Sequence, residues 1–496
     1  MRSSPLDLSP EQFRTLGHHL VDQLAELLRE MPRGPVTTGA DLTDVRDALG
    51  RRGMPREGSD PRALLDHAIE LLRAHNLYNG HPRFYGFITS SAAPIGALAE
   101  LIAATVNQNV GGYLLSPMAT EIEAQTMRWI AELLGMPEGS GGVLVSGGNM
   151  ANMVAVWTAR AQALGTGIRE RGIREVPPLR LYASGETHTW VQKAADLSGI
   201  GTDAIRWIAP DDRQRMDTGA LRDALERDRA AGDRPLAIIG TAGSVSTGAI
   251  DPLGELAAIA REHGVWFHVD GAYGAPAAIL PDAPDDLKAL READSVAVDP
   301  HKWLYAPLEA GCVIVRHPET LRDAFSYHPP YYPEAVEDPD PPIYYHEWSP
   351  QNSRGFRALK VWLALQQVGR SGYERMIAED VALAKRMFEM AAAHDELEAA
   401  TLGLSIATFR YVGPEDRDTR AQRLEELNAL NKAIMERMQS EGRAFLTNAV
   451  IDDTYLLRAC IVNFRTGEED VRAVIDEVVR VGRELSGIPV AAWVER

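Results

Sequence analysis

The central part of the chain, from about residue 85 to residue 320, alternates short apolar runs with longer segments of helical periodicity. Apolar strands separated by crossover helices are typical of a parallel or mostly parallel sheet that is buried on both faces. Helices are predicted at 121–134, before Gly135, and at 251–263, before Gly264. The predicted strands are 142–145, 180–183, 236–240, 265–269, 295–298 and 312–316. The alternation therefore predicts an α/β fold.

The segments on either side of this region follow other patterns. Ser9, Pro10 and Gln12 predict a helix N-terminus with a capping box. An apolar stripe follows from Phe13 to Leu27, and it is too short to bury itself. We therefore expect this arm to pack on its own chain or on a second subunit. After about residue 400, strand candidates and two helices predict a small α+β domain.

These patterns divide the chain into three expected parts: a helical arm at 1–84, a large α/β domain at 85–375 and the small domain at 376–496. Within the large domain, residues 326–350 contain seven prolines and five tyrosines. Such a segment cannot form a regular helix or a central strand. A long loop of this kind inside an enzyme is usually a lid or a disordered insert, and we expect a mobile loop.

Charge and composition exclude several classes of partner. The chain has 51 basic and 70 acidic residues, a formal net charge of -19, and no long cluster of lysine and arginine. Nucleic acid and anionic membranes are therefore poor partners. No run of 18 apolar residues occurs, and the N-terminus lacks a secretory signal, so we expect a soluble cytoplasmic protein.

Metal and disulfide chemistry have little support in the sequence. The two cysteines, Cys312 and Cys460, are far apart and lack CxxC spacing, which fits a reducing compartment. The pair His18 and His19 lies on the helix stripe, and the acidic run at 337–342 reads as a solvated loop. Neither has standard ligand spacing, so no metal site is expected.

Polar motifs follow three of the predicted strands, at the edge where open α/β sheets bind ligands. The first motif is Ser146-Gly147-Gly148-Asn149, a small-residue turn between a strand and a helix. Backbone N–H groups and the helix N-terminus at such a turn can bind a phosphate. A tight turn without a ligand would have the same sequence, so this motif alone decides nothing.

The second and third motifs carry an acid and an amine. Asp270 directly follows the strand at 265–269, where it can point into a cleft or simply cap a helix. Lys302 follows the strand at 295–298 and lies between His301 and Trp303. Desolvation and neighbouring cations would lower the pKa of this lysine and leave a neutral amine able to form a Schiff base.

Together these motifs supply what pyridoxal phosphate needs: an amine for the aldehyde, an acid for the ring nitrogen and a cradle for the phosphate. His188, which follows another predicted strand, has a flat ring that can stack on the pyridine. Taken alone, this histidine is better explained by a structural role.

The stretch from about residue 82 to residue 372 resembles the group II pyridoxal phosphate-dependent decarboxylases, the family of aromatic L-amino acid and glutamate decarboxylases. The most specific motifs are His-Val-Asp-Gly-Ala-Tyr at 268–273 and Asp-Pro-His-Lys-Trp at 299–303. Phe13-Arg14 in the arm and His-Pro-Arg-Phe-Tyr-Gly-Phe at 81–87 resemble the aromatic branch in particular.

The resemblance implies a role for each matching position. Lys302 would be the Schiff-base lysine, and Asp270 would keep the pyridine nitrogen protonated. His188 would stack on one face of the cofactor, and Ala272 would lie under the other. The resemblance implies that the phosphate is bound by Gly147, Gly148 and Asn149, with help from His301.

Tyr331 matches a mobile-loop tyrosine that reprotonates the α-carbon in the aromatic branch, although Tyr332 beside it leaves the register open by one residue. The chain also departs from the family. Val245 stands where a threonine is frequent near the cofactor, and Ser244 is a candidate to supply that hydroxyl.

The substrate pocket departs from the family as well. Asn79 and Gly111 stand where aromatic decarboxylases place large aromatic residues, so a wider or more polar pocket is expected. Phe87, together with Tyr85 and Tyr113, leaves aromatic surface near the expected pocket. The best expectation for the substrate is an aromatic L-amino acid.

The resemblance also implies a fold-type I architecture with a mostly parallel seven-stranded sheet, in a homodimer whose subunits share the active site. The expected reaction is decarboxylation of an L-amino acid to the amine and carbon dioxide. The alternatives are an oxidative decarboxylase that forms an aldehyde, an aminotransferase, or a cofactor-free relative of the same fold.

Overall fold

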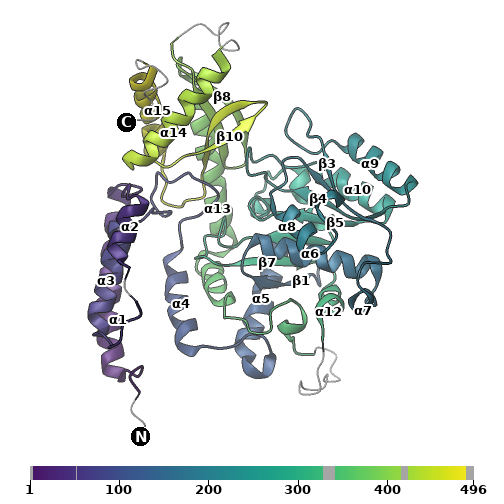
Figure 1. The fold of residues 1–496 in the computed structure, drawn as a ribbon, viewed down its shortest axis with the longest axis horizontal. Helices are drawn as coiled ribbons and strands as arrows, with labels where there is room; N and C mark the ends of the chain where they lie inside the picture. The colour runs from purple at the N-terminus through teal and green to yellow at the C-terminus, as the bar shows by residue number, and fades with distance from the viewer. Residues whose placement is uncertain (1–3, 52, 328–340, 415–422, 487–496) are drawn as a thin grey trace.

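The computed structural model describes residues 4–51, 53–327, 341–414 and 423–486 (Figure 1). Its centre is a seven-stranded sheet in the order β1-β7-β6-β5-β4-β2-β3. All neighbours are parallel except β7, which is antiparallel to β1 and β6. The strands are β1 (Gly141–Val145), β2 (Leu179–Ser184), β3 (Ile205–Ile208), β4 (Arg234–Thr241), β5 (Trp266–Asp270), β6 (Ser295–Val298) and β7 (Gly311–Val315). The predicted α/β fold with a mostly parallel seven-stranded sheet is confirmed.

Side chains of the sheet alternate between two apolar layers. Val143 and Val145 of β1 pack in one layer, whereas Leu144 packs in the other. The first layer is covered by α6 (Gly148–Leu164), α8 (Trp190–Leu197) and α12 (Glu319–Phe325). The second is covered by α5 (Pro117–Leu133), α9 (Thr218–Ala230) and α10 (Leu253–His263). Burial on both faces explains why most strands read as continuous apolar runs.

The six predicted strands match β1, β2, β4, β5, β6 and β7 to within about two residues. The edge strand β3 is missing from that set. Its Ile205 and Ile208 are buried, but Trp207 is 46% exposed, because β3 has a neighbour on one side only. Four residues with a mixed pattern give too weak a strand signal to separate from a loop.

The small domain is built on a four-stranded antiparallel sheet in the order β10-β11-β9-β8. Its strands are β8 (Leu397–Gly403), β9 (Ile406–Tyr411), β10 (Thr447–Ile451) and β11 (Thr454–Cys460). Helices α14 (Leu424–Glu441) and α15 (Glu468–Ser486) pack on it. The long helix α13 (Ala358–Ala393), with non-helical Gly369 inside it, runs from the large sheet to this domain (Figure 1).

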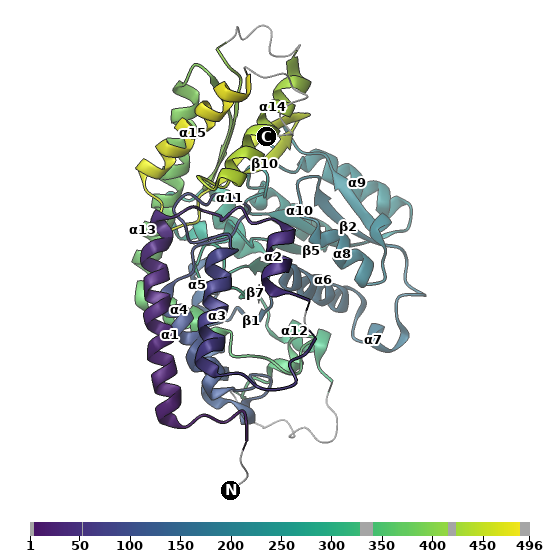
Figure 2. The same cartoon turned by 60° about the vertical axis from the view of Figure 1, so that its left-hand side comes forward.

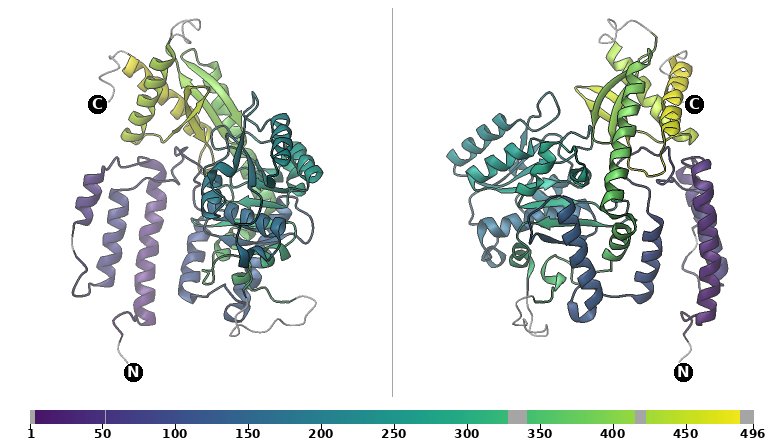
Figure 3. Two further views of the ribbon diagram at one scale, coloured as in Figure 1. Left: turned by 45° about the vertical axis from the view of Figure 1, so that its right-hand side comes forward. Right: turned by 180° about the vertical axis from the view of Figure 1, so that it is seen from behind.

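The N-terminal arm forms a separate layer of three helices beside the rest of the molecule (Figures 2 and 3). They are α1 (Pro10–Glu30), α2 (Leu42–Leu49) and α3 (Pro61–Ala74), and the predicted capping box at Ser9 is present. His19 of α1 contacts Asp66 of α3 at 2.6 Å, yet α1 contains no buried residue. The apolar stripe of the arm therefore stays largely open in the single chain.

Three further α-helices lie within the described ranges: α4 (Pro94–Val106), α7 (Ile168–Arg171) and α11 (Asp285–Lys288). None of the helices within the described ranges has both the length and the hydropathy that crossing a bilayer requires.

Candidate active site

A pocket of about 460 Å³, counting space open to solvent, lies where the carboxyl ends of the large sheet's strands meet. Asp270 ends β5, Thr241 ends β4, and Lys302 follows β6 by a short turn. All three line this pocket together with the first residues of α6. Parallel strands bring their carboxyl ends to one edge, so residues distant in sequence converge there.

The amine of Lys302 is held by a carboxylate. Its Nζ lies 3.0 Å from Oδ2 of Asp299, whose side chain is 3% exposed. The backbone N–H of Lys302 donates to the carbonyl of Asp299 at 2.8 Å, which closes the turn. The ion pair of this amine is therefore with an acid rather than with a neighbouring cation. The third residue of the motif, Trp303, is fully buried and stacks on Tyr273 with ring centroids 4.9 Å apart.

Asp270 is fixed by two donors. The indole Nε1–H of Trp190 donates to Oδ2 at 2.6 Å, and the backbone N–H of Ala272 donates to Oδ1 at 3.1 Å. The carboxylate is nearly buried and lines the pocket. Trp190 lies at the start of α8, 80 residues from Asp270 in sequence, so sequence reasoning missed this contact.

His188 lines the same pocket and is exposed to solvent. Partial desolvation in the pocket lowers the pKa of His188, and the nearby charge of Asp270 opposes that effect. The ring is therefore neutral at pH 7, since the ordinary histidine pKa is already about 6.5. The backbone N–H of Trp190 donates to its Nδ1 at 3.3 Å.

The N-terminus of α6 opens onto the pocket without a side-chain cap. Gly148 and Asn149 line the pocket, and Gly147 precedes them with a φ of 148°, a conformation that favours glycine. A Cβ at Gly148 would come within 2.7 Å of Oδ2 of Asp299. His301 lies beside Gly147, and burial lowers its pKa. Uncapped N–H groups at a helix start form an anion site.

Two buried polar atoms near the pocket have no hydrogen-bond partner among the described residues: Oδ1 of Asp299 and Oγ1 of Thr241. Unpaired buried groups cost free energy, so they indicate room for a ligand with polar atoms. Ser244 does not line the pocket, and its hydroxyl lies 2.9 Å from that of Thr247. Val245 and Thr241 line the pocket instead.

A second group of buried residues supports the pocket, and none of them was given a role of its own from the sequence. His268 of β5 contacts Oδ1 of Asn152 at 2.6 Å through Nε2 and the hydroxyl of Ser295 at 2.9 Å through Nδ1. Burial lowers the pKa of His268 to about 4, which keeps the ring neutral. Asn152 donates in turn to the carbonyl of Gly148 at 2.8 Å. This chain of contacts ties the start of α6 to β5 and β6.

The expected substrate-pocket residues lie apart from this cavity. Neither Asn79, Phe87 nor Gly111 lines it, although Ile88, next to Phe87, does. The carbonyl of Phe87 accepts from Nη1 of buried Arg458 at 2.9 Å. Gly111 is packed so closely that a Cβ would lie 2.2 Å from the carbonyl oxygen of Asn352.

The expected aromatic surface is only partly present. Tyr85 is fully buried in the core of the small domain, so its predicted place near the pocket is wrong.

The two candidate proton donors, Tyr331 and Tyr332, lie outside the described residues.

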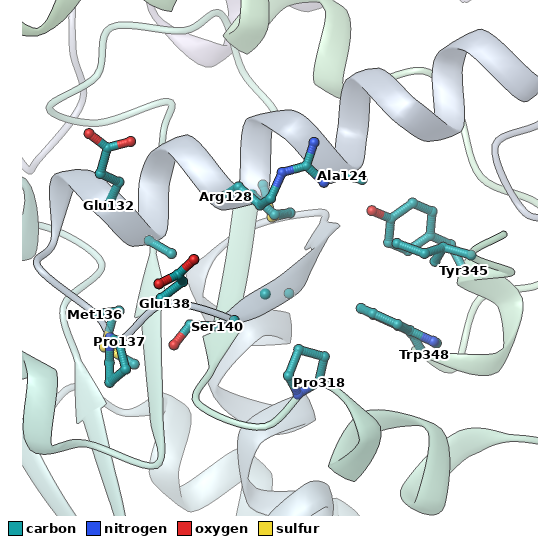
Figure 4. Close-up of a pocket in the computed structure, with 16 residues that line it drawn as sticks. Ala124, Arg128, Glu132, Met136, Pro137, Glu138, Ser140, Pro318, Tyr345 and Trp348 are labelled. Atoms are coloured by element: carbon teal, nitrogen blue, oxygen red, sulfur yellow. The ribbon is translucent and has the colours of Figure 1, made fainter. Parts of the chain in front are cut away.

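A larger cavity of about 1020 Å³ lies at the opposite end of β1 (Figure 4). Its wall is mostly apolar, with Tyr345 and Trp348 on one side and Arg128, Glu132 and Glu138 among the other lining residues. Among the residues that the structure describes, no lysine or histidine lines it, so this lining differs from that of the site at the strand ends. Size alone therefore does not mark the reactive site in this molecule.

An amine, a nearly buried carboxylate and an uncapped helix N-terminus in one pocket fit the groups of pyridoxal phosphate. The partnerless atoms of Asp299 and Thr241, and the space at Gly148 that a Cβ would fill, are consistent with that fit. The fold and the site thus define an α/β enzyme of the pyridoxal phosphate class.

Comparison with known proteins narrows this class. Residues 53–412 match the family model described as pyridoxal-dependent decarboxylase conserved domain. An aromatic-L-amino-acid decarboxylase of Bacillus atrophaeus is 30% identical, with 98% of each chain covered. A phenylacetaldehyde synthase of Petunia hybrida is 29% identical over 92% of this chain and 91% of the relative. The crystal structure of Oryza sativa TDC with PLP and tryptamine superposes with a TM-score of 0.89 at 25% identity, covering 98% of this chain and 100% of that one.

The chain belongs to the pyridoxal-dependent decarboxylase family. It is an enzyme that decarboxylates an amino acid, and its cofactor is pyridoxal 5'-phosphate.

Proposed function

We propose that the substrate is an aromatic L-amino acid and that the products are the corresponding amine and carbon dioxide. The relative from Bacillus atrophaeus is named for this substrate class, and the similarity extends over nearly the whole chain. The observation that carries the reaction type is the meeting of Lys302, Asp270 and the α6 N-terminus in one pocket, whereas the aromatic substrate class is supported by the relative.

Lys302 is the residue that binds the cofactor covalently through Nζ. Asp299, 3.0 Å away, holds that amine at the end of β6 until the cofactor arrives. When bound, pyridoxal phosphate supplies an electron-accepting ring that stabilises the negative charge left on the α-carbon after carbon dioxide departs. The remaining residues orient the reactants and hold protons.

Asp270 would pair with the ring nitrogen of the cofactor and keep that nitrogen protonated. A carboxylate close to a protonated nitrogen favours the charged form by up to a few pKa units. Hydrogen bonds from Trp190 and the backbone of Ala272 fix the orientation of the carboxylate oxygens, so Asp270 does not have to reorient during the reaction. The ring of His188 would stack on one face of the cofactor, and Ala272 would lie against the other.

The phosphate would be bound by Gly147, Gly148 and Asn149, through backbone N–H groups at the start of α6 and the amide side chain. Neutral His301 lies beside Gly147 and adds a polar contact. Thr241, whose buried hydroxyl lacks a partner among the described residues, is a better candidate than Ser244 for a hydroxyl next to the cofactor.

Tyr331 is the proposed donor of the proton that replaces carbon dioxide on the α-carbon, with Tyr332 as the alternative. Both rest on the resemblance of the sequence. A protein that supplies this proton promptly releases the amine rather than an aldehyde.

The substrate side chain is expected to contact residues of two subunits. Asn79, Phe87 and Gly111 do not line the pocket of the single chain, and the open apolar faces of the arm and α4 favour a homodimer. We propose the domain limits 1–84, 85–375 and 376–496, and a cytoplasmic location that fits the two buried free cysteines.

A panel assay of the natural amino acids tests the proposal. The purified enzyme, loaded with pyridoxal phosphate, is given each amino acid, and amine, aldehyde and hydrogen peroxide are measured. We expect amine from tryptophan, tyrosine or phenylalanine with little peroxide. Equimolar aldehyde and peroxide would favour the oxidative reaction that the name of the Petunia hybrida relative suggests. Turnover of acidic amino acids alone would overturn the aromatic assignment.

A further inference from the structure

One buried carboxylate contacts the turn that carries Lys302, residues 299–306, from outside, in addition to several hydrogen bonds to the backbone of the turn. We call this segment the lysine turn. Asp380 of α13 is 2% exposed, and its Oδ2 accepts hydrogen bonds from two residues of the turn. The indole Nε1–H of Trp303 donates at 2.8 Å, and the hydroxyl of Tyr305 donates at 2.5 Å. These donors lie on either side of Leu304, one and three residues after Lys302.

The lysine turn has a conformation that needs such support. Tyr305 has a φ of 56°, in the left-handed region that bulky residues rarely adopt. Three backbone hydrogen bonds lie within the turn: the N–H of Lys302 donates to the carbonyl of Asp299 at 2.8 Å, that of Tyr305 to Lys302 at 3.1 Å, and that of Ala306 to Pro300 at 3.0 Å. Strained backbone of this kind persists where surrounding contacts over-determine it.

Asp380 is poorly placed to serve stability alone. No lysine, arginine or histidine forms an ion pair with it within the described ranges, so its charge is balanced only by neutral donors. A buried carboxylate without a cation costs free energy. Groups that lower stability in this way are concentrated at functional sites.

The contact also links the two domains. Tyr373 of α13 donates to the carbonyl of Leu304 at 3.1 Å, and Tyr305 packs edge-on against Phe464, with ring centroids 5.6 Å apart. On its other side, Trp303 stacks on Tyr273, which lines the pocket. The lysine turn is therefore fixed between α13 and the wall of the pocket.

We propose that Asp380 is a positioning residue for Lys302. By accepting from Trp303 and Tyr305 together, it holds the lysine turn in the conformation that directs Nζ of Lys302 into the pocket. The proposal rests on the proposed role of Lys302 as the residue that binds the cofactor. The proposed role is to place that amine. Asp380 does not line the pocket, so no contact between Asp380 and the cofactor is proposed.

The test uses full-length Asp380→Ala and Asp380→Asn. Asparagine keeps an oxygen that can accept from Trp303 and Tyr305, whereas alanine removes the acceptor. Glu379→Gln, a change of the adjacent and exposed acid on α13, is the control. Hydrogen–deuterium exchange of the cofactor-free proteins is measured for peptides that cover 299–306, 148–164 and 370–393.

We expect Asp380→Ala to speed exchange in 299–306 at least tenfold and to leave 148–164 within twofold of wild type. Asp380→Asn should restore most of the protection, and Glu379→Gln should match wild type. With the cofactor added, Asp380→Ala should lower kcat at least tenfold and slow the appearance of the visible absorbance, with KM within about twofold. Tyr305→Phe, which removes one donor, should have a smaller effect of the same kind.

Unchanged exchange in 299–306 for both Asp380→Ala and Tyr305→Phe would overturn the proposal. Equal acceleration in all three peptides would do the same, because it would indicate a general loss of stability. Failure of the proposed function is a separate outcome: Lys302→Ala would then keep the visible absorbance, whatever the exchange data show.

Discussion

At the scale of single residues, the site depends on how firmly the carboxylate of Asp270 is aimed. Two donors hold it, one from Trp190 and one from the backbone of Ala272. Of these two hydrogen bonds, only the one from the Trp190 side chain can be removed by a substitution that leaves the backbone unchanged. Hydrogen bonds to a charged group are each worth about 1.5–3 kcal/mol.

Trp190→Phe removes that donor and keeps an aromatic ring in the core. We expect a 10- to 100-fold lower kcat/KM and weaker retention of pyridoxal phosphate, because a loosely held Asp270 stabilises the ring nitrogen less well. Trp157→Phe is the matched control, since its indole donates to Ser198 at 2.9 Å, away from Asp270. Equal activity of the two variants would argue against the assigned role of Trp190.

The identity of the residue that donates a proton to the α-carbon can also be tested by single substitutions. Tyr331→Phe should shift the products from amine toward aldehyde, ammonia and hydrogen peroxide, because an α-carbon that is not protonated promptly can react with dioxygen. Product analysis with an oxygen electrode measures the shift, and Tyr332→Phe is the paired variant. If Tyr331→Phe retains the wild-type amine yield and Tyr332→Phe loses it, the donor is Tyr332.

The motif residues could be predicted from the sequence, and their supporting residues could not. Lys302 and Asp270 each follow an apolar strand, so their arrival at one edge follows from local pattern and sheet geometry. Trp190 and Asp380 act on residues about 80 positions away, and no spacing rule connects them. Ser244 was a reasonable hydroxyl candidate by position, but its side chain bonds to Thr247.

At the scale of elements, α13 and the lysine turn are joined by Asp380, a buried acid with a raised pKa. Burial raises the pKa of Asp380 to about 7, whereas Tyr305 and Trp303 lower it. The titratable groups around it are Tyr305 on the turn, Glu379 on α13 and Cys460 in β11.

The sign of the pH effect follows from that raised pKa. An aspartate titrates near pH 3.9 in the unfolded chain, so its contribution to stability is complete below about pH 4 and is lost as the pH rises through about 7. The loss is on the order of 2–4 kcal/mol. Asp380→Asn cannot ionise and should therefore be more stable relative to wild type at pH 8 than at pH 5.

Urea unfolding of both proteins at pH 5 and pH 8, at one protein concentration, measures this difference. The same difference in free energy of unfolding at the two pH values would show that Asp380 does not titrate in this range. Glu379→Gln again serves as the control, since an exposed acid should give little pH-dependent difference.

Elements with a strong periodic signal could be predicted, and those shaped by their neighbours could not. The capping box at Ser9 and the αL residue Gly264 at the end of α10 are local signals, and they are present. Strand β3 is short and half-exposed, so its sequence shows no clear period. Helix α13 is interrupted at Gly369, whose φ of 68° lies in the left-handed region that favours glycine.

At the scale of the whole molecule, a large apolar surface is left open in the single chain. The described part of α4 exposes Leu98, Leu101, Ile102 and Val106 by 47–56% each, and the one acid of that helix, Glu100, pairs with Lys360 at 2.6 Å. The arm exposes Phe13 by 49%. Contiguous apolar surface of this extent is typical of an interface.

Ile102→Asp should therefore convert the proposed homodimer into monomers. Burying such a side chain contributes about 1.5–3 kcal/mol, and a charge there opposes association further. Sedimentation velocity measures the mass, and Leu197→Asp, at an exposed position at the end of α8, is the control. A wild-type protein that sediments as a monomer would contradict the dimer and the shared substrate pocket together.

The central claim is that the amine of Lys302 carries the cofactor, and it can be tested by chemical labelling. The holoenzyme is reduced with borohydride and digested, and mass spectrometry locates the pyridoxyl group. The account predicts one label, on the peptide that contains Lys302, and neither label nor visible absorbance in Lys302→Ala. A label on Lys193 or Lys360 instead, or normal carbon dioxide release by Lys302→Ala, would contradict it.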